Sequence, residues 1–123
     1  MGDGDETKGD DVATVVSVLD DSLARSILVR TANRALSADE LVEGSESSRT
    51  TVYRRIRRLV ELDLLTESQE LDPDGHHFNT YRARLDRVTI DLGTNGFDID
   101  VDRQVVEDDA VDRLNRLYER LQQ

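Results

Sequence analysis

The chain has 123 residues, of which 37% are hydrophobic and 35% are charged, and its formal net charge at pH 7 is -11. This length accommodates one domain with a short appendage and a lean hydrophobic core. The absence of cysteine excludes disulfides, thiolate metal sites and thiol redox switches, and the two histidines, His76 and His77, are too few for a zinc site. No apolar stretch approaches the roughly 18 residues of a membrane-spanning helix, so we expect a cytoplasmic protein without a membrane partner.

The charged residues are unevenly divided, because 27 acidic side chains stand against 16 basic ones, and Lys8 is the single lysine among these sixteen. Short, strongly hydrated carboxylates with almost no lysine suit solubility in concentrated salt, where screening removes most of the repulsion between like charges. We therefore expect adaptation to high salt, with bound cations at the acidic surface. An ordinary acidic protein with a chance shortage of lysine is the alternative.

The first part of the chain predicts a tail followed by two helices. Residues 1–10 contain glycines and acids and almost no apolar side chains, which predicts a disordered acidic tail. A helical pattern of apolar residues begins at Asp11. Asp20 or Asp21 is then expected to cap a second helix.

A short strand is expected around Leu36, followed by a short helix. Ser37 and Glu40 have the spacing of a capping box at the start of this helix. Gly44 lies at its end, where a residue with positive φ is expected.

Residues 49–58 are the most informative part of the sequence, because they hold five arginines and no acid in an otherwise acidic chain. We expect a helix over Ser48–Leu62, capped by serine, in which Val52, Ile56 and Leu59 pack inward. A local reversal of charge this sharp indicates an anion-binding surface. The candidate DNA contacts on this helix are Ser48, Arg49, Thr50, Thr51, Tyr53, Arg54, Arg57 and Arg58.

We assign base reading to Arg49, Thr50 and Arg54, since arginine takes a guanine edge with two hydrogen bonds and threonine contacts a thymine methyl group. The residues assigned to the phosphate backbone are Arg55, Arg57 and Arg58. Tyr53 has two equal interpretations, core packing and phosphate contact. A solvated face with internal ion pairs is the alternative for the arginines.

Beyond this helix the period of the apolar residues changes from 3.6 to 2, which predicts two β-hairpins. The first spans Leu64–Leu85 and turns at Asp72-Pro73-Asp74-Gly75. His76, His77 and Asn79 near its tip are further candidate DNA contacts. We expect no metal site from the two histidines, because adjacent strand residues point to opposite faces.

The second hairpin is expected over residues 87–104, with its turn centred on Asn95-Gly96. The expected cross-strand pairs are Leu92 with Ile99 and Ile90 with Val101. A shift of alternation near Asp86 predicts a bulge or a break between the two hairpins. The other face carries aspartates that alternate with apolar residues, which favours a solvated strand over a calcium loop.

Residues 105–123 predict an amphipathic helix with one wide apolar stripe. The stripe either folds onto the chain's own core or, as we favour, pairs with a second copy of the chain, together with the helix that begins at Asp11. The residues expected at this dimer interface are Val12, Val15, Val16, Leu19, Val111, Leu114, Leu117, Tyr118 and Leu121.

The order helix, short strand, helix, tight turn, long helix and β-hairpin is that of a winged helix-turn-helix. Over residues 20–103 the chain resembles the small, ArsR-like winged-helix transcriptional regulators of halophilic archaea. The matching motifs are LSADELVE, SRTTVYRRIRRLVELDLL, LDPDGHHFNTY and ARLDRVTIDL followed by GFDIDV. The resemblance implies dimeric binding of double-stranded DNA, with the recognition helix in the major groove and the wing over the minor groove or the phosphates. The chain differs from the metal-sensing branch of ArsR-like proteins in having no cysteine, and the resemblance therefore names no effector.

The predicted fold is α+β, a winged helix-turn-helix with an extra β-hairpin and a C-terminal dimerisation helix. The expected limits are residues 1–10 for the tail, 11–86 for the DNA-binding domain, 87–104 for the extra hairpin and 105–123 for the last helix. The expected function is that of a homodimeric, sequence-specific transcriptional regulator. A winged-helix module that binds a protein of the transcription machinery is the alternative. No phosphate loop and no nucleophile with a histidine partner occur, so we expect neither enzymatic activity nor a cofactor.

Overall fold

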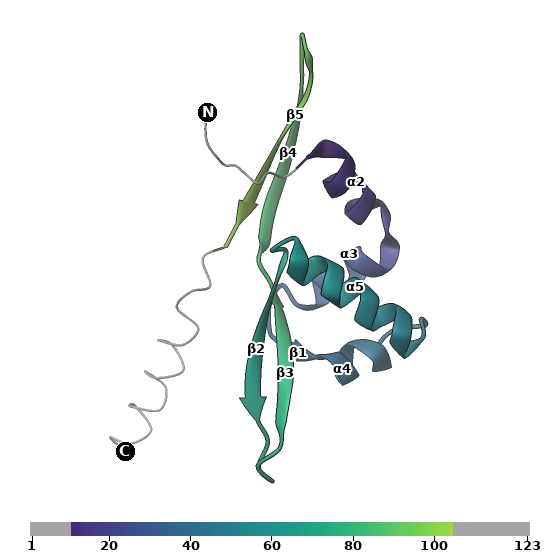
Figure 1. Ribbon diagram of the computed structural model, residues 1–123, viewed down its shortest axis with the longest axis vertical. Coiled ribbons are helices and arrows are strands. Elements are labelled where there is room, and N and C mark those ends of the chain that lie inside the picture. Colours follow the sequence, from purple (N-terminus) through teal and green to yellow (C-terminus); the bar gives the residue numbers. More distant parts are fainter. Residues whose placement is uncertain (1–10, 105–123) are drawn as a thin grey trace, which may run out of the picture.

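The computed structural model describes residues 11–104, which form four helices on one side of the strands (Figure 1). The elements are α2 (Val12–Asp20), α3 (Ser22–Arg30), β1 (Leu36–Ser37), α4 (Ala38–Glu43), α5 (Arg49–Glu61), β2 (Leu65–Leu71), β3 (His77–Ala83), β4 (Leu85–Gly93) and β5 (Gly96–Arg103). This mixture confirms the α+β class. The predicted tail, 1–10, and the predicted last helix, 105–123, lie outside the described residues. No helix within residues 11–104 is long and apolar enough to cross a membrane.

Aspartates define the boundaries of the first two helices. The carboxylate of Asp11 caps α2 by accepting a hydrogen bond from the amide of Thr14 at 2.7 Å. Asp21 ends α2 and also caps α3, since its carboxylate accepts from two amides of the first turn of α3 at 2.9 and 3.1 Å. The two helices meet as predicted, and Asp21 rather than Asp20 is the cap.

Helix α4 begins with the predicted capping box. The amide of Ser37 donates to the Glu40 carboxylate at 2.8 Å, and the amide of Glu40 donates to the Ser37 hydroxyl at 3.1 Å. The expectation for the end of this helix was wrong, because Gly44 has an ordinary φ of -87°. A glycine fits there for a different reason: a Cβ would collide with the guanidinium of Arg30, which donates to the carbonyls of Glu40 and Leu41 at 2.8 and 3.0 Å.

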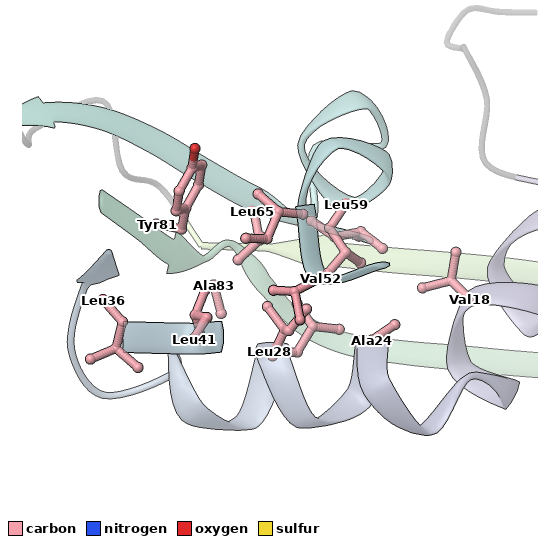
Figure 2. Close-up of a cluster of buried hydrophobic side chains, with 13 residues drawn as sticks. Val18, Ala24, Leu28, Leu36, Leu41, Val52, Leu59, Leu65, Tyr81 and Ala83 are labelled. Carbon is pink, nitrogen blue, oxygen red and sulfur yellow. The ribbon is translucent and has the colours of Figure 1, made fainter. Parts of the chain in front are cut away.

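Helix α5 supplies the centre of the hydrophobic core. Val52, Ile56 and Leu59 are exposed by only 0, 4 and 1%, as predicted. Each such buried side chain contributes about 1.5–3 kcal/mol relative to an exposed one. Figure 2 shows Val52 and Leu59 within the cluster, with Tyr81 at its edge and the tyrosine hydroxyl turned outward. The remaining buried members are Val18, Ala24, Ile27, Leu28, Leu36, Leu41, Leu64, Leu65 and Ala83.

The carboxyl end of α5 is closed by a residue with positive φ. Asp63 has a φ of 60°, and the amide of Leu64 donates to the carbonyl of Leu59 at 2.9 Å. Arg103, at the end of β5, donates from Nε to the carbonyl of Asp63 and from Nη2 to that of Leu62, both at 2.9 Å. The second hairpin is therefore attached to the end of α5 by one guanidinium group.

The first hairpin belongs to a three-stranded antiparallel sheet with the order β1-β3-β2. Tyr81 of β3 lies opposite Leu36 of β1 and, on its other side, opposite Glu67 of β2. The predicted turn is confirmed, because the amide of Gly75 donates to the carbonyl of Asp72 at 3.0 Å and Gly75 has a φ of 87°.

The second hairpin forms a separate two-stranded sheet, β4–β5, which we call the ribbon. Its register differs from the prediction, because Leu92 pairs with Phe97 and Ile90 pairs with Ile99. The turn is Thr94-Asn95, and Gly96 follows it with a φ of 132°. Glycine adopts this conformation far more readily than other residues, so Gly96 closes the turn and does not occupy its centre. The register shift of two residues leaves all large apolar side chains on one face, as predicted.

The junction between the two hairpins lies earlier than predicted. Strand β3 ends at Ala83 and β4 begins at Leu85, so the ribbon starts two residues before the expected limit at residue 87. The predicted bulge is confirmed, since Leu85 pairs with Arg103 and the register then shifts before Arg87.

Candidate nucleic-acid interface

The outward face of α5 carries three arginines that have no partner among the described residues. Arg54, Arg57 and Arg58 are exposed, and within residues 11–104 no hydrogen bond or ion pair engages their guanidinium groups. The buried side chains on the opposite face of the helix fix its orientation, so these three groups must face solvent. The prediction that they point outward is confirmed, and the alternative of internal ion pairs does not apply to them in the described part of the chain.

Arg55, in contrast to these three arginines, has a partner. Its guanidinium forms an ion pair with the carboxylate of Asp21, and both side chains are partly buried, with 34 and 25% exposure. Burial opposes the charge of Asp21, but hydrogen bonds from the amide of Ala24 and from Arg55 outweigh it and lower the pKa of Asp21 below its usual value. Arg55 therefore attaches α5 to the junction of α2 and α3, a contact that the sequence did not predict.

A groove of about 370 Å³ lies where the arginine face of α5 meets the α2–α3 junction. Its lining residues are Ser17, Val18, Asp21, Ala24, Arg54, Arg55, Arg57, Arg58, Leu59 and Glu61. Four guanidinium groups against two carboxylates make the groove attractive to an anion. The sequence did not indicate Ser17, because its proximity to α5 depends on the packing of α2 in the folded chain.

The start of α5 is organised by its cap. The Ser48 hydroxyl accepts from the amide of Thr51 at 3.2 Å and donates to the Thr51 hydroxyl at 2.9 Å. Thr50, between them, is exposed and points away from the core. The hydroxyl groups of Ser48 and Thr51 are thus hydrogen-bonded to each other, and Thr50 remains accessible to a ligand.

Arg49 and Tyr53 form one unit with α4. The guanidinium of Arg49 lies 2.6 Å from the Asp39 carboxylate, donates to the Tyr53 hydroxyl at 3.3 Å and lies 5.8 Å from the centre of its ring. The hydrogen bond that Arg49 donates to the Asp39 carboxylate raises the pKa of Arg49 further above its already high value. Tyr53 is 41% exposed, so it lies at the surface and not in the core. This pairing holds the first base-reading candidate against α4.

The three candidates on the first hairpin lie away from α5. His76, His77 and Asn79 are all exposed at the β2–β3 tip, which projects past α4 in Figure 1. His76 Nδ1 lies 3.5 Å from Asp72, and the Asn79 amide donates to Glu67 at 3.4 Å. The structure therefore brings together the α5 candidates, whereas the hairpin candidates form a second, separate group.

The turn of this hairpin also gathers side chains that sequence reasoning did not group. Asp72, Asp74 and His76 each place one possible metal-ligand atom within 4.8 Å of the others. Asp72 already accepts from the amides of Asp74 and His76 at 2.9 and 2.8 Å, which is the ordinary use of an aspartate in a turn. The aspartates Asp98 and Asp100 lie on a regular strand, β5, and are exposed.

The residues predicted at a dimer interface fall into two groups. On α2, Val16 is 44% exposed, Val12 and Leu19 are half-buried, and Val15 is only 3% exposed. Val15 is thus already buried within one chain, since α2 packs against α3 and β5. The other predicted residues, Val111, Leu114, Leu117, Tyr118 and Leu121, lie outside the described residues.

Comparison with models of known protein families gives no match, and no curated protein is significantly similar to the sequence.

Proposed function

We propose that the chain is a sequence-specific DNA-binding transcriptional regulator of the winged helix-turn-helix type. Under this proposal α4 and α5 form the helix-turn-helix, joined by residues 44–48, α5 is the recognition helix and the β2–β3 hairpin is the wing. The element order and the strand order β1-β3-β2 support it. The protein acts in the cytoplasm of a salt-accumulating cell, as a homodimer on two half-sites about 34 Å apart.

The observation that carries the proposal is the set of guanidinium groups of Arg54, Arg57 and Arg58, which have no partner within residues 11–104. An acidic chain with a net charge of -11 gains nothing in solubility from concentrating arginines on one face. A helix of 13 residues is about 20 Å long, which suits the major groove of duplex DNA. Arginine matches both guanine edges and phosphates with paired hydrogen bonds.

Under the proposal, the residues of α5 have different roles. Thr50 and Arg54 lie near the start of the helix, where base edges are read. Arg57 and Arg58 lie further along and hold phosphates beside the groove next to the α2–α3 junction. Arg49 approaches the bases from its position against Asp39. The candidates on the wing, His76, His77 and Asn79, contact the neighbouring backbone or minor groove.

The test is binding of labelled duplexes, selected from genomic fragments, to the wild-type chain and to two variants. The first variant combines Arg54→Ala with Arg57→Ala and so removes two proposed contacts with DNA. We expect its affinity for the duplex to fall about 100-fold or more, since each contact contributes about 1–3 kcal/mol. Arg87→Ala is the matched control, because Arg87 is an exposed arginine on β4. It removes one positive charge and leaves binding within about 3-fold.

Unchanged folding of both variants, measured by circular dichroism and urea unfolding, makes the comparison valid. Equal binding by the wild-type chain and the double variant overturns the proposal. Absence of any duplex complex also overturns it and favours the protein-interaction module.

A further inference from the structure

One face of the ribbon is apolar from its turn to the pair Val88–Val101. Alternation along paired strands places its large apolar side chains together, namely Val88, Ile90, Leu92, Phe97, Ile99 and Val101. Near the base of the ribbon this face is covered, since Val101 packs against the core cluster and α2 lies beside β5. Towards the turn it is open: Ile90, Leu92 and Phe97 are exposed by 42, 74 and 60%. Figure 1 shows this end of the ribbon extending past α2.

The open end of this face differs from the other exposed apolar residues of the described part. Val29 on α3 and Leu71 on β2 are exposed singly, which is normal for a protein surface. Leu92 and Phe97, in contrast, are directly paired across the strands, and Ile90 is two residues from Leu92 on the same face. A contiguous apolar patch on a two-stranded sheet, which is marginally stable by itself, indicates a surface that another element covers.

The opposite face of the ribbon restricts the direction from which that element approaches. Its side chains include Asp91, Asp98 and Asp100, and Asp91 lies directly across the strands from Asp98. Like charges in this position repel each other, and they also repel a second chain with a net charge of -11. The open end of the apolar face carries no charged residue, so it is the surface that a second copy of this acidic chain can approach.

Residues 105–123 provide an apolar stripe of suitable length. The segment 107–123 would be about 25 Å long as a helix, and the eight residues of β5 extend about 26 Å. Arg113, Arg116 and Arg120 recur at helical spacing along one side of its stripe.

The position of Gln104 favours the segment of a second chain over that of the same chain. The amide of Gln104 donates to the carbonyl of Arg84 at 2.6 Å, which fixes the start of the segment at the base of the ribbon. Phe97 is seven residues away along β5, about 23 Å. The part of the apolar face between them already lies beside α2, so the segment of the same chain meets a covered surface first.

We propose that the open end of the apolar face, formed by Ile90, Leu92 and Phe97, is covered by residues 105–123 of a second copy of the chain. Two chains then exchange their C-terminal segments around a two-fold axis. The inference rests on the homodimer of the proposed function and names its interface, and no part of it requires DNA.

The first test measures the mass of the full chain in solution without DNA. A dimer of the 13.9 kDa chain is expected, and Leu92→Asp combined with Phe97→Asp is expected to give the monomer mass. Leu71→Asp is the matched control, because Leu71 is 61% exposed on β2, and this variant stays dimeric. Unfolding curves of both variants check that the domain is intact. A monomeric wild-type chain, or a dimer that persists in the ribbon variant, overturns the inference.

The second test uses the natural absence of cysteine, which makes introduced thiols unique. One chain carries Leu92→Cys, and a second, mass-tagged chain carries Leu114→Cys, Leu117→Cys or Leu121→Cys, so that one of the three registers meets the geometry of a disulfide. The mixed chains are oxidised, and we expect a disulfide between the tagged and untagged chains. Leu71→Cys mixed with the same three variants is the control and forms none.

Failure of all three pairs to cross-link overturns the inference, and so does a cross-link formed only within one chain that carries both substitutions. A disulfide between two Leu92→Cys chains also overturns it, because ribbon would then face ribbon. Mass and cross-linking are independent of DNA, so a dimer that binds no duplex rejects the proposed function alone. A monomer that still binds duplex rejects this inference together with the homodimer, and leaves DNA binding by α5 standing.

Discussion

Arg55 of α5 forms an ion pair with Asp21, the residue at which α2 ends and α3 begins. Asp21 therefore performs two tasks, since the same carboxylate accepts the amides that start α3. Because both side chains are partly buried, the pair is less screened than a fully exposed ion pair. Two adjacent arginines of α5 thus have different roles. Arg55 fixes the helix in the domain, whereas the guanidinium group of Arg54 faces solvent.

The first prediction separates the structural arginine from its neighbours. Arg55→Ala leaves Asp21 charged and without its partner, so we expect the free energy of unfolding to fall by about 1–2 kcal/mol. Arg57→Ala is the matched control on the exposed face and is expected to change it by less than about 0.5 kcal/mol. Urea unfolding measures both values. Equal losses in the two variants would contradict the assignment of Arg55 to structure.

The second prediction concerns Gly44 and Arg30. Gly44→Ala forces the Arg30 guanidinium to move, which breaks its hydrogen bonds to the carbonyls of Glu40 and Leu41. We expect the unfolding free energy to fall by about 1 kcal/mol, because one half-buried hydrogen bond, to Leu41, and one exposed hydrogen bond, to Glu40, are lost. The backbone itself accepts alanine, because φ at Gly44 is -87°.

A double-mutant cycle tests the cause of this loss. Arg30→Ala alone is expected to cost about as much as Gly44→Ala, and the double variant no more than either. Additive losses would show that Gly44 is required for a reason unrelated to Arg30.

The contrast between these positions explains which features the sequence predicts. The capping box of Ser37 and Glu40 is readable because its partners are three residues apart. The role of Gly44 depends on Arg30, which precedes it by fourteen positions and reaches it only in the folded chain. A terminal glycine is usually explained by positive φ, and nothing local distinguishes that explanation from the correct one.

In the candidate site too, features that depend on neighbouring residues were predicted, and features that depend on contacts in the folded chain were not. Helical periodicity separates the inward Val52 and Ile56 from the outward Arg54 and Arg57, because that distinction depends only on the helix itself. Arg55 lies on the flank of the helix, and its ion pair joins residues 34 positions apart. The ribbon was predicted with its apolar face correct and its register wrong by two residues, since either turn keeps the same side chains on that face.

The third prediction concerns Asp63, which has a φ of 60° at the end of α5. Glycine takes this conformation without the steric cost of a side chain, so Asp63→Gly is expected to raise the unfolding free energy by about 0.5–1 kcal/mol. Its loss of a 3.8 Å contact with Arg84 is minor, because the contact is long and the Asp63 side chain is 62% exposed. Asp63→Val is expected to lower stability by about 1–2 kcal/mol. A gain from valine in thermal unfolding would contradict the strained-backbone explanation.

The fourth prediction concerns stability at high pH. Burial, together with the hydrogen bond that the Tyr81 hydroxyl donates to Glu67 at 2.8 Å, raises the pKa of Tyr81 to about 12. Because the folded pKa exceeds the unfolded value of about 10, this stabilisation is complete below pH 10 and is lost as the pH rises towards 12. The slope of this contribution is at most about 1.4 kcal/mol per pH unit.

Tyr81→Phe is expected to remove this alkaline slope and to lower stability at neutral pH by about 1 kcal/mol through the lost hydrogen bond. Urea unfolding of the wild-type chain and the variant across this pH range measures both effects. Parallel curves above pH 10 would mean that another group causes the alkaline loss.

The last prediction concerns the dependence of DNA binding on salt. Phosphate contacts normally release cations from DNA, and the logarithm of affinity falls with the logarithm of salt concentration with a slope of about -0.9 per contact. Here carboxylates accompany the proposed contacts, since Asp39 lies 2.6 Å from Arg49 and Asp72 and Asp74 form the tip of the proposed wing. Near a phosphate these carboxylates require cations, and uptake of cations offsets their release.

We therefore expect binding to survive molar potassium chloride, with a shallow or even positive slope. Anisotropy titrations of a labelled duplex across a series of salt concentrations measure this slope, and Asp39→Asn provides the internal comparison. Removing this carboxylate reduces cation uptake, so the slope of the variant becomes more negative by up to about one unit. A steep negative slope in the wild-type chain, with binding lost well below one molar, would mean that its arginines meet DNA without intervening cations.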